Sequence, residues 1–199
     1  MRLVASLIFL MALLTGCANV PADYKFDETK AKGVVIGSVT FESGMGRYYL
    51  VVQPVAGGNN IDLGFGCAVW PCIDPAEDEA FPKRGGPYAV ELDEGRYRIV
   101  GWRISRGPRK TRSSEKVDIE FDVERNKTTY LGNLHFDPHW EDVQLRDASE
   151  IDIPIIKMRY PFVQNSPIRI SIAPGTEIHK VGGEYRNIFT MPIYIFVPR

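Results

Sequence analysis

Three residues that lie close together in the sequence have the types and spacing that can hold a metal ion. They are His135, Asp137 and His139, in the segment His-Phe-Asp-Pro-His. An extended chain places residues two apart on the same face, which would bring two imidazoles and one carboxylate together. Zinc and related divalent ions prefer these ligands. Pro138 interrupts an extended strand, so the alternative interpretation is an ordinary loop after a strand.

Sequence motifs for nucleophilic catalysis are missing. The sequence contains neither a Gly-x-Ser-x-Gly elbow nor a phosphate-binding glycine loop followed by Lys. Gly64-Phe65-Gly66 lacks the further glycine and the helix of a dinucleotide fingerprint. We therefore predict no catalytic nucleophile and no cofactor, and an enzyme is the less favoured class of function.

A cationic segment is the second candidate site. Arg106, Arg109, Lys110 and Arg112 surround Gly107 and Pro108, between two apolar runs. We expect a long basic hairpin loop here. Its simplest role is a solvated connection, and its functional role would be contact with an anionic surface, because guanidinium groups match phosphate and carboxylate geometry.

The first residues resemble a bacterial lipoprotein signal peptide. An apolar run from Leu3 to Leu14 follows Arg2, and Leu14-Thr15-Gly16-Cys17 resembles the lipobox. The run is shorter than the ~20 apolar residues that span a bilayer. The resemblance implies removal of residues 1–16 and a diacylglyceryl group on Cys17. The Ala that follows this Cys implies sorting to the outer membrane, with the domain on its periplasmic face.

Cys67 and Cys72 remain as a pair once Cys17 is assigned to lipid. In an oxidising compartment such a pair favours a disulfide. A thioredoxin-like redox pair is less favoured, because that chemistry uses two intervening residues rather than four. A zinc site would need two further ligands, which the neighbouring sequence does not supply.

The composition indicates one domain of ordinary size. The chain has 199 residues and a formal net charge of −1. A nucleic-acid-binding protein needs a basic surplus, so we expect no nucleic-acid partner. Residues 17–32 are polar and lack an apolar period, which predicts a lipidated Cys followed by an extended tether. Residues 33–199 are predicted to form a single domain.

Short β-branched and aromatic runs separated by Gly, Pro, Asn and Asp follow the predicted tether. Residues 34–41 and 47–53 flank a glycine-containing turn, and residues 88–92 and 96–104 flank Asp-Glu-Gly, so both pairs predict hairpins. Residues 116–123 alternate apolar and charged side chains, as a half-buried strand does. Such regular short strands indicate an antiparallel β-sandwich.

One helix is predicted in the second half of the chain. Ile151, Ile155 and Met158 recur at helical spacing, and Pro161 follows them. Pro154 is tolerated only in the first turn, so we place Asp152 at the N-cap and the helix near residues 153–160.

The segment Leu92-Asp-Glu-Gly-Arg-Tyr97-Arg-Ile99 is similar to a segment of prealbumin-like, PEGA-type and carboxypeptidase-regulatory-type β-sandwich domains. The resemblance covers residues 86–136 and implies a prealbumin-like sandwich. No activity is implied by it, because function resides in sites rather than in folds.

Together these features predict a lipid-anchored envelope protein that binds or assembles rather than catalyses. The anchor at Cys17 implies the membrane as one partner, and an envelope protein, lipopolysaccharide or peptidoglycan as another. Trp70 and Trp140 fall in predicted loops, where an exposed indole would suit a glycan, whereas Trp102 lies in a predicted strand and is expected in the core. The alternative function is a metal-dependent periplasmic enzyme that uses His135, Asp137 and His139.

Overall fold

The structure is a computed structural model, and it describes residues 19–43, 46–66, 80–106, 109–114, 117–139, 143–171 and 183–187. The strands are β1 Lys32–Phe41, β2 Arg47–Pro54, β3 Ile61–Gly66, β4 Gly85–Asp93, β5 Gly95–Arg106, β6 Arg109–Ser113, β7 Ile119–Val123, β8 Thr128–Phe136, β9 Val143–Arg146, β10 Ile168–Ile170 and β11 Gly183–Asn187. The helix α2 spans Ser149–Arg159, and a 3₁₀ turn, η1, spans Pro161–Gln164.

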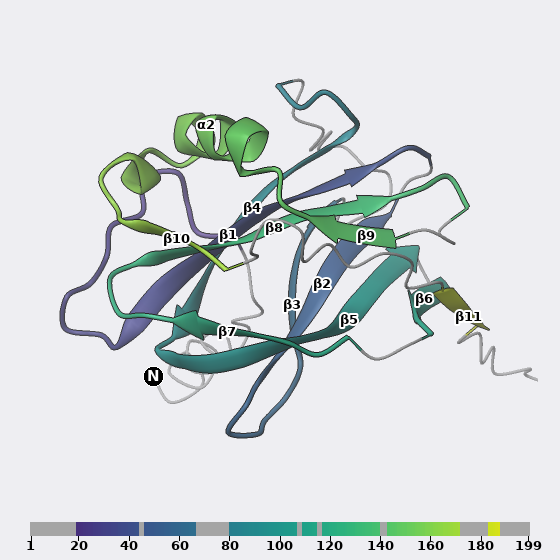
Figure 1. Ribbon diagram of the computed structural model, residues 1–199, viewed down its shortest axis with the longest axis horizontal. Helices are drawn as coiled ribbons and strands as arrows, with labels where there is room; N and C mark the ends of the chain where they lie inside the picture. Colours follow the sequence, from purple (N-terminus) through teal and green to yellow (C-terminus); the bar gives the residue numbers. More distant parts are fainter. Residues whose placement is uncertain are drawn as a thin grey trace, which may run out of the picture.

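Two sheets pack face to face (Figure 1). Sheet A has the order β10-β8-β1-β4, and β9 also pairs with β8. Sheet B has the order β11-β6-β5-β2-β3, and β7 also pairs with β5. Most pairs are antiparallel, but β1 and β10 both run parallel to β8. The predicted fold class, a β-sandwich with one short helix, is confirmed.

The main core lies between the two sheets, and aromatic side chains dominate it. Phe41 stacks on Tyr48 with ring centroids 4.5 Å apart, and Phe136 lies 5.0 Å from Tyr48. The Trp102 ring meets Phe136 edge-on at 5.4 Å. Trp102 is only 3% exposed, as its position in a strand predicted. These large rings bury much of the apolar area that stabilises a sandwich.

Both predicted hairpins are wrong, because in each case the two strands belong to different sheets. β1 pairs with β4 and β8, whereas β2 pairs with β3 and β5. In the same way β4 lies in sheet A and β5 in sheet B, with Glu94 between them. Turn residues report that the chain reverses direction, but they do not report which strand lies beside the next one.

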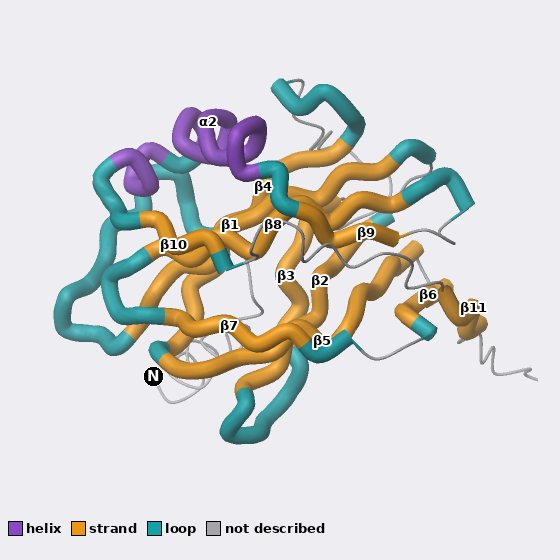
Figure 2. The backbone as a smooth tube through the Cα atoms, in the orientation of Figure 1, coloured by secondary structure: helices purple, strands orange, loops and turns teal. Residues whose placement is uncertain are grey.

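The helix α2 covers the outer face of sheet A, on the side away from sheet B (Figure 2). A second apolar cluster fills this layer, formed by Val20, Val34, Ile36, Ala89, Tyr130, Ile156, Tyr160 and Val163. The helix begins at Ser149 rather than near residue 153, so Asp152 is not its N-cap. The N-cap is Ala148, with no side-chain cap hydrogen bond, and the Asp147 carboxylate before it accepts the Ser149 N–H at 2.9 Å. Pro154 lies inside the helix on its exposed side, where water can satisfy the carbonyl that has lost its partner.

The N-terminal segment differs from the expected tether. The Val20 N–H donates to the Ala89 carbonyl of β4 at 2.8 Å, and the Val20 side chain is buried. Tyr24 packs against the Phe162 ring with centroids 5.0 Å apart, and its hydroxyl donates to Glu91 at 2.7 Å. Residues 19–26 are therefore docked on sheet A before β1 begins.

Candidate functional site

The candidate site is a cationic surface on the outer face of sheet B. Alternation along the strands creates it: Tyr48, Leu50, Ile104 and Thr111 point into the sandwich and are buried. Their neighbours in sequence point outward. Four of these outward residues are cationic, and we call them the basic face: Arg47 on β2, Arg103 on β5, and Lys110 and Arg112 on β6.

Strand register brings the basic face together. Arg103 is the register partner of Arg112 on one side and of Tyr49 on the other. Two residues further along β5, Ser105 is the register partner of Arg47 on one side and of Lys110 on the other. Neighbouring strands lie ~4.8 Å apart, so these side chains share one small patch.

Arg103 is held at the centre of this patch. Its guanidinium lies over the Tyr49 ring, 5.2 Å from the centroid, and donates to the Asp62 carboxylate of β3. A cation over an aromatic face gains ~0.5–1 kcal/mol at an exposed site. Gly64 of β3 is the register partner of Tyr49. It has no side chain, so nothing at this position displaces the Tyr49 ring. Lys110 and Arg112 are exposed, so the patch is open to a partner.

The prediction of a long basic loop is wrong. Arg106 and Arg109 are register partners at the end of the β5–β6 hairpin, and only residues 107–108 lie between the two strands. A two-residue connection suffices for antiparallel strands, so the cations occupy rigid strands rather than a long loop. Arg47 was missed, because its place beside Ser105 depends on the pairing of β2 with β5.

A buried polar network lies under α2, on the outer face of sheet A. Asp152 is 2% exposed, and its Oδ2 accepts hydrogen bonds from the Ser38 hydroxyl at 2.5 Å and the Tyr130 hydroxyl at 2.7 Å. Burial raises the pKa of this carboxyl. Asn133 donates to Ser38 at 2.6 Å and accepts from Thr40 at 3.1 Å. These contacts fix α2 to strands β1 and β8.

The network continues to His135, one of the predicted metal ligands. His135 is 6% exposed, with Nδ1 2.9 Å from Thr40 Oγ1 and Nε2 3.3 Å from Lys83 Nζ. Nε2 also lies 3.4 Å from the Glu42 carboxylate, so it can accept from Lys83 or, when protonated, donate to Glu42. Burial lowers the pKa of His135, and the nearby charges of Lys83 and Arg146 act in the same direction. Both ring nitrogens are thus engaged within the protein.

The predicted metal triad is not assembled in the structure. β8 ends at Phe136, so Asp137 and His139 lie beyond the strand. The two-residue alternation of an extended chain therefore does not place them on the same face as His135. The Asp137 carboxylate accepts the backbone N–H of His139 at 3.3 Å. Within the described ranges, no three His, Cys, Asp or Glu side chains are grouped so that they could hold a metal ion.

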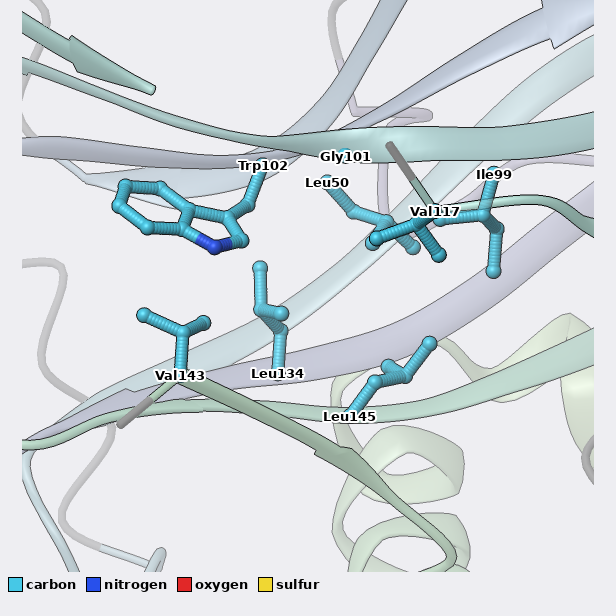
Figure 3. A pocket seen from close by; sticks show the side chains of 8 residues that line it. All are labelled: Leu50, Ile99, Gly101, Trp102, Val117, Leu134, Val143 and Leu145. Atoms are coloured by element: carbon cyan, nitrogen blue, oxygen red, sulfur yellow. The ribbon is translucent and has the colours of Figure 1, made fainter. Parts of the chain in front are cut away.

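An apolar pocket opens between the sheets (Figure 3), with an empty volume of about 230 Å³ that includes space open to solvent. It lies where β5 changes partner, from β7 at Gly95–Ile99 to β6 at Arg103–Arg106. Its lining residues are Leu50, Ile99, Gly101, Trp102, Val117, Leu134, Val143 and Leu145. Only Trp102 among them carries a polar side-chain atom, so the pocket has little that could orient a polar substrate.

Several predicted features fall outside the described residues. These are the signal peptide of residues 1–16, the lipidation site Cys17, the pair Cys67 and Cys72, and the two indoles of Trp70 and Trp140. Among the helices that the structure describes, none has the length and apolar character needed to cross a bilayer.

Comparisons with known proteins add one distant similarity. No protein-family model matches the chain, and no curated protein matches it. Among solved structures, a leucine-rich repeat protein from Bacteroides thetaiotaomicron VPI-5482 aligns with 54% of this chain at 17% identity and a TM-score of 0.33. The chain spans 14% of the length of that protein. A similarity of this size carries no argument about fold or function.

Proposed function

We propose that the protein is a binding or assembly module of the bacterial envelope, anchored by lipid at Cys17 to the periplasmic face of the outer membrane. The observation that carries the binding role is the basic face, where strand register gathers Arg47, Arg103, Lys110 and Arg112 on one surface. The lipobox-like segment at residues 14–17 supports the anchor.

The chemistry of the basic face favours an anionic partner. Arginine presents a planar set of donors that matches carboxylate and phosphate oxygens. Arg103 lies opposite Arg112, and each has an acidic neighbour: Asp62 accepts a hydrogen bond from Arg103, and Glu184 of β11 is the register partner of Arg112. An anionic partner would therefore meet chiefly the exposed Lys110 and Arg112. Because the cations lie on paired strands, the surface is rigid before the partner binds, which reduces the entropy lost on binding.

A test of this function is crosslinking of the full-length lipoprotein in intact cells, followed by mass spectrometry of the copurified molecules. The test variant reverses two exposed charges of the basic face, Lys110→Glu and Arg112→Glu. The matched control reverses two exposed charges elsewhere, Lys25→Glu and Lys30→Glu, of which Lys30 forms a surface ion pair with Asp27. We expect the test variant to lose a partner that the control retains.

A third variant, Cys17→Ser, removes the proposed anchor. We expect it to leave the membrane fraction and to lose partners that depend on membrane attachment. An unchanged set of partners in the Lys110→Glu, Arg112→Glu protein would contradict the role of the basic face. Retention of the Cys17→Ser protein in the outer-membrane fraction would contradict the anchor.

A further inference from the structure

The distance between the proposed lipid anchor and the folded domain is short. Asn19 already belongs to the domain, because its side-chain oxygen accepts the Ala89 N–H of β4 at 3.1 Å. The next residue, Val20, packs in one cluster with Ile156 of α2. Only Ala18 separates Asn19 from Cys17. Two residue steps reach at most ~7 Å, so a lipid on Cys17 holds this side of the domain against the bilayer.

The exposed apolar side chains lie on the same side. Among the described residues, the exposed large hydrophobic side chains are Ile151, Met158 and Ile170, at 51%, 68% and 46% exposure. Ile151 and Met158 lie on α2, and Ile170 lies on β10, at the edge of sheet A. Scattered exposed hydrophobic residues are common on soluble proteins, but these three share one side of the sandwich.

Five residues of α2 are exposed, and three of them, Ile151, Pro154 and Met158, form what we call the apolar stripe; the other two are Glu150 and Arg159. The spacing of three and four residues places the apolar stripe on one side of the helix. The side of α2 that faces sheet A carries Asp152 and Ile156, which are buried, and Ile155 is buried beside the stripe. Lys157 and Arg159 flank Met158 in the last turn. Apolar residues flanked by cations are typical of a helix that lies in a membrane interface.

We infer that the apolar stripe of α2 docks on the lipid surface of the membrane that carries the anchor. This inference rests on the proposed lipidation of Cys17. An α-helix is ~10 Å across, so the stripe lies about one helix diameter above the layer in which Val20 is docked. The anchor therefore brings the stripe to the interface without a flexible linker, and an interfacial helix buries its apolar face ~5–10 Å deep.

The same orientation places the basic face away from this membrane. Sheets A and B pack face to face, with α2 on the outer face of A (Figure 2). The alternation along β2, β5 and β6 puts the basic face on the outer face of B. With α2 against the bilayer, Lys110 and Arg112 point into the periplasm. The anionic partner of the basic face is then a component of the periplasmic space rather than the anchoring membrane.

The test uses the full-length lipoprotein reconstituted into vesicles of phosphatidylethanolamine and phosphatidylglycerol with brominated acyl chains, which quench tryptophan on contact. Met158→Trp places a reporter on the stripe. Glu120→Trp places a matched reporter at an exposed position of β7 in sheet B. We expect the Met158→Trp protein to lose more emission than wild type in brominated vesicles, and the Glu120→Trp protein to behave as wild type.

Flotation of the vesicles separates failure of the anchor from failure of the docking. A protein that does not float with the vesicles would overturn the anchor and this inference together. A protein that floats, with equal quenching of the two reporters, would overturn the docking alone and would assign the stripe to another occupant, such as a protein or a second copy of this chain. Ile151→Asp in the Met158→Trp background should reduce the quenching, because a carboxylate resists entry into the interface.

Discussion

Replacing Asp152 by Ala tests the buried network that fastens α2 to sheet A. The Oδ2 atom of Asp152 accepts hydrogen bonds from two buried hydroxyl groups, those of Ser38 and Tyr130. Each buried hydroxyl left without a hydrogen-bond partner lowers the free energy of unfolding by ~1–3 kcal/mol. Removing the carboxylate, whose charged form is disfavoured by burial, offsets part of this loss. We expect Asp152→Ala to lower the free energy of unfolding by ~2–4 kcal/mol.

The matched control is Asp152→Asn, which keeps an oxygen that can accept both hydrogen bonds and removes the charge. We expect it to stay within ~1 kcal/mol of wild type, because its amide is similar in shape. Asp152→Ala in a Tyr130→Phe background should cost less than in wild type, since one hydroxyl fewer is stranded. The assay is urea unfolding of the lipoprotein in detergent micelles, followed by the fluorescence of Trp102, which is buried in the folded domain.

The pH dependence gives the same network a second test. Burial raises the pKa of Asp152 in the folded protein above its ordinary value near 4. The folded state therefore binds this proton more tightly than the unfolded state. The resulting stabilisation is complete below pH ~4 and is lost as the pH rises through the folded pKa. Relative to Asp152→Asn, wild type should lose stability as the pH rises above ~4.

Two results would refute this reasoning. Equal stability of the Asp152→Ala and Asp152→Asn proteins would mean that the two hydroxyl groups do not depend on the carboxyl oxygen. A difference between wild type and Asp152→Asn that stays constant from pH ~4 upward would mean that burial does not disfavour the charged form.

Two further substitutions test the packing of sheet A. Gly37→Ala would place a Cβ against the Tyr88 hydroxyl oxygen. We expect this to lower the free energy of unfolding, measured by thermal unfolding, by ~1–3 kcal/mol. Tyr88→Phe should restore part of the loss. A wild-type melting temperature for Gly37→Ala would contradict this. Phe162→Ala removes the ring that packs on Tyr24, so hydrogen exchange should accelerate in residues 19–26 while β1 keeps its protection. Unchanged exchange there would show that the N-terminal segment is held by other contacts.

The strands and the core could be predicted from local patterns, because period-two alternation directly reports which residues face an apolar layer. The strand predicted at residues 116–123 was identified in this way and forms at Ile119–Val123, and Trp102 is buried as its place in a predicted strand indicated. The same patterns failed at the connections. The chain from β1 to β2 and the chain from β4 to β5 both pass between sheets, where the sequence predicted hairpins. Alternation assigns a face to a residue, but it carries no information about the neighbouring strand.

The candidate site shows the same division. The sequence determined that Arg106, Arg109, Lys110 and Arg112 are close together along the chain, and that residues 14–17 resemble a lipobox. Arg103 precedes this cluster along the chain, and only the tertiary structure added Arg47 to the basic face, through the pairing of β2, β5 and β6.

The tertiary structure also decided two further points. Asp152 is a buried acceptor rather than a helix cap, because its helix begins earlier and lies over Ser38 and Tyr130. Residues 19–26 are docked rather than extended, because Val20 and Tyr24 find partners on β4 and η1. Local propensity and alternation are set by near neighbours along the chain. Partners distant in sequence are chosen by the packing of the whole fold, and these contacts decide the charge, burial and placement of the site.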